Sequence, residues 1–402
     1  MGAHRDRGGR YSLSRRPRPG NALTVCSSEA ANEIVARTTA DFRMPTQATK
    51  HMTGKKVLTA IEICAGGGGQ ALGLECAGFE HSAVVEIDSA ACCTLRTNRP
   101  GWNIIEGDLQ SFDGKPYKGA DLLAGGVPCP PFSIAGKQLG ADDERDLFPV
   151  ALRLVREIKP RAVMLENVRG LADPKFARYR EDILSRLEDL GYRSAWRLLN
   201  ASDFGVPQLR PRFILVSLRR KYANRFEWPT RQGSPPTVGE ALLDLMSARG
   251  WRGAKAWAEA ANDVGPTVVG GSKKHGGPDL GPTRARRQWA QLGVDGRSIA
   301  NEAPDRTVPV GAMPKLTVQM VARIQGFPDS WSFVGKKTAA YRQVGNAFPP
   351  PVATAIGKAI AAALSGTTSE KELSRGLSGL PLLELMERKR ASSRRACSRT
   401  AR

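Results

Sequence analysis

Short apolar runs that alternate with amphipathic stretches are the clearest pattern in this sequence. Runs rich in β-branched and aliphatic residues predict buried strands at 57–63, 81–86, 120–124 and 161–165. Apolar residues at helical spacing predict helices at 70–77, closed by Gly78, at 147–158, stopped by Pro160, and at 176–190, capped by Gly191. Strands that alternate with helices form right-handed crossovers, so the pattern predicts an α/β fold with a doubly wound, Rossmann-like sheet.

The texture changes at about residue 222, where glycine and proline punctuate the chain and strong periodicity is lost. We expect a second, smaller and irregular domain here, with Trp228, Trp251, Trp257 and Trp289 in its core rather than stacked on bases. Regular structure returns at 316–325, and 351–364 predicts a helix of small residues. The predicted organisation is a basic disordered arm (1–52), a larger α/β domain (53–221), a smaller irregular domain (222–312), a closing segment with a helix that returns to the larger domain (313–365) and a basic tail (366–402).

Basic residues are in large excess, with 60 Lys and Arg against 39 Asp and Glu, a net charge of +21. Nine basic residues outnumber four acidic ones in each of 1–52 and 366–402, so more than half of the excess lies between them. This charge favours a polyanionic partner, nucleic acid before a membrane surface, although basic residues that only maintain solubility are the alternative.

The seven cysteines include no C-x-x-C pair, which predicts neither a disulfide framework nor a zinc site. No run approaches the roughly 20 apolar residues of a membrane helix. The N-terminus lacks the apolar core of a secretory signal, and a transit peptide is the weaker alternative. We therefore expect a cytoplasmic protein without a bound metal.

A glycine run, 66–69, follows the first predicted strand and precedes a helix, where backbone can approach a ligand closely. A tight turn is the simpler explanation. The dinucleotide fingerprint needs glycine at 71 or 72, where Ala71 and Leu72 stand. Glu86, at the end of the second strand, suits ribose hydroxyls, so the motif favours an adenosine-containing ligand, S-adenosylmethionine before NAD.

Three further motifs carry chemistry. Cys129 stands between Pro128 and Pro130, which indicates a positioned thiol, although lone cysteines are commonly buried and inert. Glu166 follows a buried strand, where a salt-bridge or capping role is the alternative. Arg210 and Arg212 are two residues apart and would point to one face of an extended chain, with a solvated edge strand as the alternative.

In order and spacing, these motifs resemble the DNA (cytosine-5) methyltransferases over about 57–364. Residues 62–69 look like the family's first cofactor motif, with Cys64 where Phe is common, and Pro128-Cys129 matches the catalytic Pro-Cys pair. Further matches are Glu86 and Asp108 as ribose and adenine ligands, Glu166-Asn167-Val168, Gln208-x-Arg210-x-Arg212, and the closing motifs at 323–328 and 343–347. The resemblance implies a Rossmann-like, S-adenosylmethionine-dependent methyltransferase of the bacterial restriction-modification type.

The resemblance implies that Cys129 adds to carbon 6 of cytosine, which activates carbon 5 for methylation. Glu166 would share a proton with ring N3, Arg212 would hold the exocyclic oxygen and orient Glu166, and Arg210 or Arg212 would favour the thiolate. The base that removes the carbon 5 proton is open, with water among the candidates. The cofactor, released as S-adenosylhomocysteine, would be held by Cys64, Ala65, Gly66, Gly68, Gly69, Glu86, Ile87, Asp108, Leu109, Pro128, Leu147, Asn346 and Ala347.

Carbon 5 is inaccessible inside a duplex, so the cytosine must be flipped out. We expect the loop at 130–145 to close over double-stranded DNA from one groove while 222–312 reads the other. Candidate DNA contacts are Ser133, Lys137, Gln138, Gln208, Lys273, Lys274, Arg284, Arg286 and Arg287. An RNA (tRNA) cytosine-5 methyltransferase and a catalytically dead DNA-binding module are the rival functions, and we expect a monomer.

Overall fold

The computed structural model describes residues 57–128, 146–271 and 277–366. Cys129, the loop at 130–145 with Ser133, Lys137 and Gln138, both Lys273 and Lys274, and the predicted arm and tail lie outside the described residues. Predictions that concern their placement therefore stay predictions.

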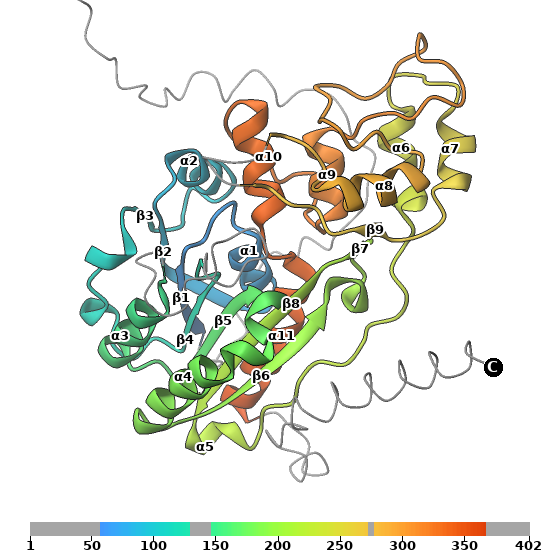
Figure 1. The fold of residues 1–402 in the computed structure, drawn as a ribbon. Helices are drawn as coiled ribbons and strands as arrows, with labels where there is room; N and C mark the ends of the chain where they lie inside the picture. Colours follow the sequence, from blue (N-terminus) through green and yellow to red (C-terminus); the bar gives the residue numbers. More distant parts are fainter. Residues whose placement is uncertain (1–56, 129–145, 272–276, 367–402) are drawn as a thin grey trace, which may run out of the picture. The chain divides into compact units, whose positions relative to one another are not determined.

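A seven-stranded sheet with the order β3-β2-β1-β4-β5-β8-β6 lies at the centre of the larger lobe of the described chain (Figure 1). The strands from β1 to β5 run parallel, and β8 is antiparallel to both β5 and β6. Every residue of β4 is buried, as expected for a central parallel strand. The strands are β1 (Leu58–Ile63), β2 (Phe79–Glu86), β3 (Ile104–Glu106), β4 (Leu122–Gly125), β5 (Ala162–Val168), β6 (Tyr192–Asn200) and β8 (Pro211–Arg219).

Helices cover both faces of this sheet, which confirms the doubly wound prediction. One face packs against α3 and α4, whose apolar residues share a core with Ile61, Leu123 and Val163. The other packs against α11, which also contacts α1 so closely that a Cβ on Gly73 would lie 2.5 Å from the Cβ of Ala353. The helices are α1 (Gly69–Cys76), α2 (Ser89–Asn98), α3 (Phe148–Ile158), α4 (Ala177–Asp189), α5 (Arg220–Ala223) and α11 (Pro350–Ser365), with 3-10 turns at Leu109–Ser111, Lys115–Tyr117, Arg169–Ala172, Pro174–Phe176 and Ala201–Phe204.

A second, mostly helical lobe lies beside the sheet (Figure 1). Its core contains three of the four tryptophans, at 0–6% exposure, whereas Trp228 is half-buried near the sheet. A two-stranded parallel pair, β7 (Gln208–Leu209) with β9 (Gly265–Pro266), links this lobe to the chain that enters β8. Its helices are α6 (Val238–Ser247), α7 (Ala254–Ala260), α8 (Thr283–Gln291), α9 (Val318–Ile324) and α10 (Lys337–Asn346).

The domain borders differ from the predicted ones because packing sets them. Ala223 and Phe226 are buried in the sheet core, so the predicted border at 222 is too early. Conversely, Leu316 and Met320 share the tryptophan core, so the predicted closing segment returns to the sheet only with α11. We call 237–271 with 277–346 the second lobe and the remaining described residues the sheet lobe.

The stretch Lys337–Ser365 is long and apolar enough to cross a membrane on composition alone, but 67% of its most apolar window is buried within the fold. It consists of α10 and α11, which pack against different cores. Core packing therefore accounts for its apolar character.

Candidate active site

A cavity of about 220 Å³ lies where the carboxyl ends of β1, β2 and β5 meet α10. Ligands of doubly wound sheets bind at this edge. The predicted cofactor residues Cys64, Ala65, Gly66, Glu86, Asn346 and Ala347 line this cavity, together with Glu62, Gly67, Gln70, Asp88, Ala91, Gly126, Glu166, Ala339, Arg342, Gln343 and Phe348.

The glycine run forms one wall of the cavity and depends on glycine for two reasons. Gly66 and Gly68 have φ values of +53° and +86°, which favour residues without a side chain. A Cβ on Gly69 would lie 2.1 Å from the carbonyl oxygen of Phe348, so backbone from the closing motif approaches the run directly. Cys64, just before the run, also has a positive φ of 52°. A simple tight turn, the alternative raised from the sequence, does not account for this close approach.

Glu86 ties the glycine run to the end of β2. Its carboxylate accepts hydrogen bonds from the backbone N–H groups of Gly66 (2.6 Å), Ile87 (2.9 Å) and Asp88 (2.8 Å). Asp88 in turn caps α2 by accepting from Ala90 N and Ala91 N. Main-chain N–H groups therefore hold the carboxylate of Glu86, the residue predicted to bind ribose, at the cavity wall.

The other predicted cofactor residues lie outside the cavity lining. Asp108 is exposed and caps the 3-10 turn that starts at Leu109 by accepting from Gln110 N at 2.9 Å, while Leu109 is buried. Ile87 is 65% exposed and Pro128 is exposed, whereas Leu147 packs partly buried against the sheet core at the start of α3. Gly68 and Gly69 shape the wall through their backbone.

Two cavity residues, Glu62 on β1 and Gln70 in the first turn of α1, were not among the predicted cofactor ligands, although Glu62 begins the motif at 62–69. They are 0% and 3% exposed, and all four of their side-chain polar atoms lack a hydrogen-bond partner within the described chain. Burial raises the pKa of Glu62 well above its usual range. The available signal was an acid inside an apolar strand, directly before the glycine run.

Glu166 and Arg212 form a largely buried ion pair at the cavity edge, with Nε of Arg212 2.6 Å from Oε1 of Glu166. Antiparallel pairing of β5 with β8 sets Val168 opposite Arg212 and so brings the two strand ends together. Burial lowers the pKa of the Arg212 guanidinium, and the Glu166 carboxylate opposes this effect. The structure thus brings together the two side chains that were predicted to bind one cytosine base.

The chain that leads to Cys129 runs beside this pair. A Cβ on Gly126 would lie 3.3 Å from Oε2 of Glu166, and Nδ2 of Asn167 donates a hydrogen bond to the carbonyl oxygen of Val127 at 3.1 Å. Asn167 therefore holds Val127 next to the end of β5, and Gly126 leaves little room for a side chain beside Glu166.

Arg210 does not point to the same place as Arg212. It is 1% exposed, and its guanidinium donates to the carbonyl oxygens of Val268 (2.6 Å), Gly345 (2.9 Å) and Ala347 (2.9 Å). Burial, followed by the nearby Arg212 charge, lowers its pKa. The predicted catalytic placement of Arg210 is corrected: its contacts join the break between β7 and β8 to the second lobe and to Ala347 just beyond it.

Gln208 is likewise not available to DNA, because it is 0% exposed. Its amide nitrogen donates to Oε1 of Gln325 at 2.7 Å, and its amide oxygen accepts from Val268 N at 2.8 Å. Gln325 continues the chain of contacts to the carbonyl oxygen of Val344 at 2.8 Å. The predicted DNA contact of Gln208 is corrected to a buried link between β7, β9, α9 and α10.

Of the described candidate DNA contacts, Arg284 and Arg287 are exposed on α8, and the half-exposed Arg286 donates to Oγ1 of Thr283 at 3.3 Å. The opposite face of α8 carries Trp289, whose ring covers Gly265 of β9. The exposed arginines therefore stand on an element that packs directly on the link between the lobes.

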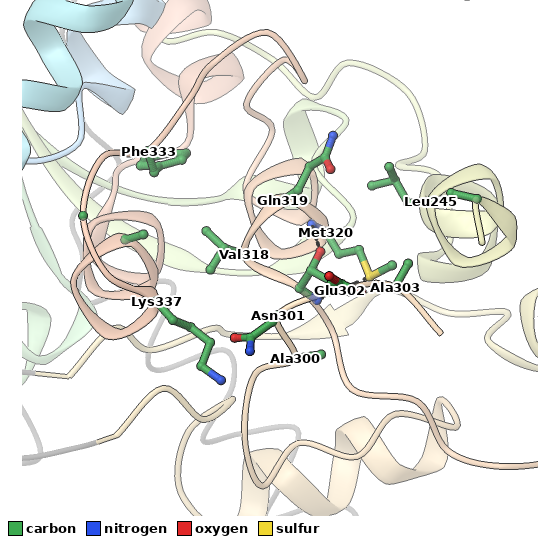
Figure 2. Close-up of a pocket in the computed structure, with 14 residues that line it drawn as sticks. Leu245, Ala300, Asn301, Glu302, Ala303, Val318, Gln319, Met320, Phe333 and Lys337 are labelled. Atoms are coloured by element: carbon green, nitrogen blue, oxygen red, sulfur yellow. Dashed lines mark hydrogen bonds between the residues drawn. The ribbon is translucent and has the colours of Figure 1, made fainter. Parts of the chain in front are cut away.

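A larger cavity of about 380 Å³ lies in the second lobe between the end of α6, the starts of α9 and α10, and residues 300–303 (Figure 2). Its charged side chains have partners: Lys337 donates to the carbonyl oxygen of Ile299 at 3.0 Å, and Glu302 pairs with Arg249. None of the predicted site residues lines it. The cavity at the sheet edge is therefore the candidate active site.

Comparisons with known proteins identify the family of the chain. The family model of C-5 cytosine-specific DNA methylases matches residues 58–362. The chain is 61% identical over 312 residues to the Type II methyltransferase M.NaeI of Lentzea aerocolonigenes, covering 77% of this chain and 76% of that protein. It is 56% identical over 310 residues to the Type II methyltransferase M.NgoMIV of Neisseria gonorrhoeae, covering 76% and 98%.

Solved structures of similar fold have much lower sequence identity. The Entamoeba histolytica methyltransferase EhMeth aligns with a TM-score of 0.55 and 15% identity over 77% of this chain and 99% of its own. The S. pombe Dnmt2 methyltransferase aligns with a TM-score of 0.52 and 17% identity over the same shares. At these identities the likeness concerns the fold alone.

Proposed function

We propose residue roles from the premise that this chain belongs to the C-5 cytosine-specific DNA methylase family, as its family match and its relatives show. The protein is a DNA (cytosine-5) methyltransferase. Because M.NaeI and M.NgoMIV are Type II methyltransferases, we assign it to a bacterial restriction-modification system, acting on a specific sequence of double-stranded DNA in the cytoplasm.

The cavity at the sheet edge fits S-adenosylmethionine, which supplies an electrophilic methyl group on a sulfonium. Buried Glu62 and Gln70 have polar atoms without partners, as a ligand site requires. Glu86 keeps acceptor capacity for ribose hydroxyls, since a carboxylate has about four lone-pair sites and three are used. Asp108, exposed at the end of β3, remains our candidate for the adenine amino group.

For the reaction, the Cys129 thiolate forms a bond to carbon 6 of a flipped cytosine, and the ring electrons move toward carbon 5. Glu166 shares a proton with ring N3 as negative charge develops, and Arg212 holds both the exocyclic oxygen and the Glu166 carboxylate. Carbon 5 takes the methyl group, a base then removes its proton, and the electron pair left behind expels the cysteine sulfur. The observation that supports this assignment is the 2.6 Å contact between Arg212 and Glu166 beside the root of the Cys129 loop.

An exposed polar stripe on α8 supports the DNA-binding proposal. Arg284, Arg287, Gln288 and Gln291 are exposed at a spacing of three or four residues, so they share one helix face. The helix contains no acidic residue. Arginine and glutamine donors suit phosphates and base edges. We propose that this face contacts DNA, next to Lys273 and Lys274 in the preceding segment.

Transfer of tritiated methyl groups tests the function. Purified protein with labelled cofactor should label duplex DNA and not tRNA, and Cys129→Ser should abolish the labelling. Sequencing of methylated positions on plasmid DNA from expressing cells would then give the recognition site. Transfer to tRNA alone would favour the RNA methyltransferase, and absence of transfer to both would favour a DNA-binding module without activity.

A further inference from the structure

Glu62 and Gln70 are the most deeply buried polar side chains of the cofactor cavity. They face it from β1 and from the first turn of α1, with exposures of 0% and 3%. Neither the two carboxyl oxygens of Glu62 nor the amide atoms of Gln70 have a hydrogen-bond partner within the described residues. Buried polar groups in folded proteins are nearly always paired, so this pair calls for a ligand.

The acidic side chains around Glu62 disfavour a further negative charge on Glu62 when the cavity is empty. The lining contains Cys64 on the same strand, Glu86 and Asp88 at the end of β2, and Glu166 on β5. Its cation is Arg342 on α10, which is half-buried. Burial penalises an ionised carboxyl strongly, and it raises the pKa of Glu62 well above its usual range. Without a ligand, burial therefore favours the neutral form of Glu62.

The ligand chemistry follows from the donor and acceptor pattern. A carboxylate and an amide oxygen are acceptors for an ammonium group, which has three donors and one positive charge. The amino-acid end of S-adenosylmethionine carries such a group, whereas its adenosine end carries none. An ammonium beside Glu62 would compensate the buried negative charge and reverse the preference for the neutral acid.

We propose that Glu62 is protonated in the empty cavity and releases its proton to solvent when the α-ammonium of the cofactor binds, with Gln70 as the second contact. This inference rests on the proposed function, in that the cavity is the cofactor site. Cofactor uptake is then coupled to proton release: Glu62–COOH and the ligand ammonium give a carboxylate–ammonium pair and one proton in solution. Gln70 is a positioning residue for the same end of the cofactor.

Isothermal titration calorimetry with S-adenosylhomocysteine tests the coupling without turnover. The observed binding enthalpies in two buffers of different ionisation enthalpy should reveal up to one released proton per ligand on the acidic side of the Glu62 pKa, and fewer as the pH rises past it. Over the same range the affinity should increase with pH by up to about tenfold per pH unit, because only the deprotonated form of Glu62 pairs with the ligand. Affinity becomes constant above the pKa of Glu62.

Two variants and a second ligand isolate Glu62. Glu62→Gln should lose the proton release and the pH dependence, whereas Gln70→Leu should keep both while binding S-adenosylhomocysteine more weakly. Methylthioadenosine, which lacks the amino-acid end, should bind wild type and both variants alike and release no proton. It also shows that each variant is folded.

The outcomes separate this inference from the proposed function. Binding of S-adenosylhomocysteine to wild type without buffer dependence, or proton release that persists in Glu62→Gln, would overturn the coupling and leave the cofactor site intact. Failure of wild type to bind either ligand would overturn the cofactor site, and the coupling with it.

Discussion

The sheet lobe and the second lobe position their functional groups in different ways. In the sheet lobe, polar residues stand at strand ends, so the parallel sheet itself gathers Glu62, Glu86 and Glu166 around one cavity. In the second lobe, polar residues lie on the outer face of a helix whose inner face is fixed by Trp289. The proposed catalytic groups are therefore positioned by backbone pairing in one lobe, and the proposed DNA-contacting groups by side-chain packing in the other.

The largest expected effect is a loss of turnover from a substitution at the proposed catalytic site in the sheet lobe. We expect Glu166→Gln to reduce kcat by about 10²- to 10⁴-fold, because the amide cannot share a proton with ring N3. The amide oxygen can still accept from Arg212, so melting temperature and affinity for S-adenosylhomocysteine should change little. Single-turnover methylation of duplex DNA measures the effect. A kcat within about threefold of wild type would remove Glu166 from the proposed mechanism.

The next largest expected effect is a loss of stability from a substitution in the core of the second lobe. Trp289→Ala removes a fully buried ring that covers Gly265, and we expect a loss of about 3–5 kcal/mol in the free energy of unfolding. Denaturant titration measures it, with the half-buried Trp228→Ala as the matched control that should lose less. DNA affinity should fall before affinity for S-adenosylhomocysteine does. Equal losses in both affinities would contradict the division between lobes.

A smaller effect is expected from a close backbone contact within the second lobe, beside the cavity at the sheet edge. A Cβ on Gly345 of α10 would lie 2.5 Å from the Cα of Gly270, so Gly345→Ala should cost about 1–3 kcal/mol of stability. Gly277→Ala is the control, because no atom lies within 4 Å of its added Cβ. Similar melting temperatures for the two variants would contradict the close approach.

The smallest effect concerns the exposed face of α8. We expect Arg287→Ala to weaken DNA binding and to reduce the slope of log affinity against log salt by about 1, as for one lost phosphate contact. Arg220→Ala on α5, whose side chain lies 3.6 Å from Glu188, is the control and should leave the slope unchanged. If Arg287→Ala relaxes the sequence preference instead, this arginine reads a base.

Much of the sheet lobe could be predicted from sequence because its signals are local. Apolar runs, and glycines that end helices, predicted the bounds of eight elements to within a few residues. These elements are β1, β2, β4, β5, α1, α3, α4 and α11. The antiparallel strands β6 and β8 were missed, and their pairing is what sets Arg212 beside Glu166. Residue type and motif spacing thus indicated the partners, but only the sheet register explains how they meet.

Arg210 shows where reasoning from spacing fails. If Arg210 and Arg212 belonged to one continuous strand, their spacing of two residues would put both side chains on the same face. Arg210 instead lies in the break between β7 and β8, so the alternation does not continue and its side chain turns to Val268 and Gly345. Contacts with residues 58 and 135 positions away cannot be inferred from a local pattern.

The second lobe was predicted as irregular because its helices are short and its core is assembled over long separations. Helix α7 has seven residues, too few for a periodic pattern, and Trp257 donates a hydrogen bond to the carbonyl oxygen of Gly293. The same core includes Leu316 and Tyr341, which lie beyond the predicted domain border. Four tryptophans were nonetheless assigned to this core on residue type alone, which is confirmed for three of them, whereas Trp228 packs partly buried against the sheet core.

The approach of Gly270 to Gly345 has a consequence for attempts to exchange specificity between enzymes of this kind. A transplanted recognition segment would have to thread its backbone past the end of α10, where Asn346 donates to the carbonyl oxygen of Gly271. A side chain at position 270 would clash with Asn346, which also lines the cavity at the sheet edge. Chimaeras should therefore carry glycine at this junction, whatever sequence they are built to read.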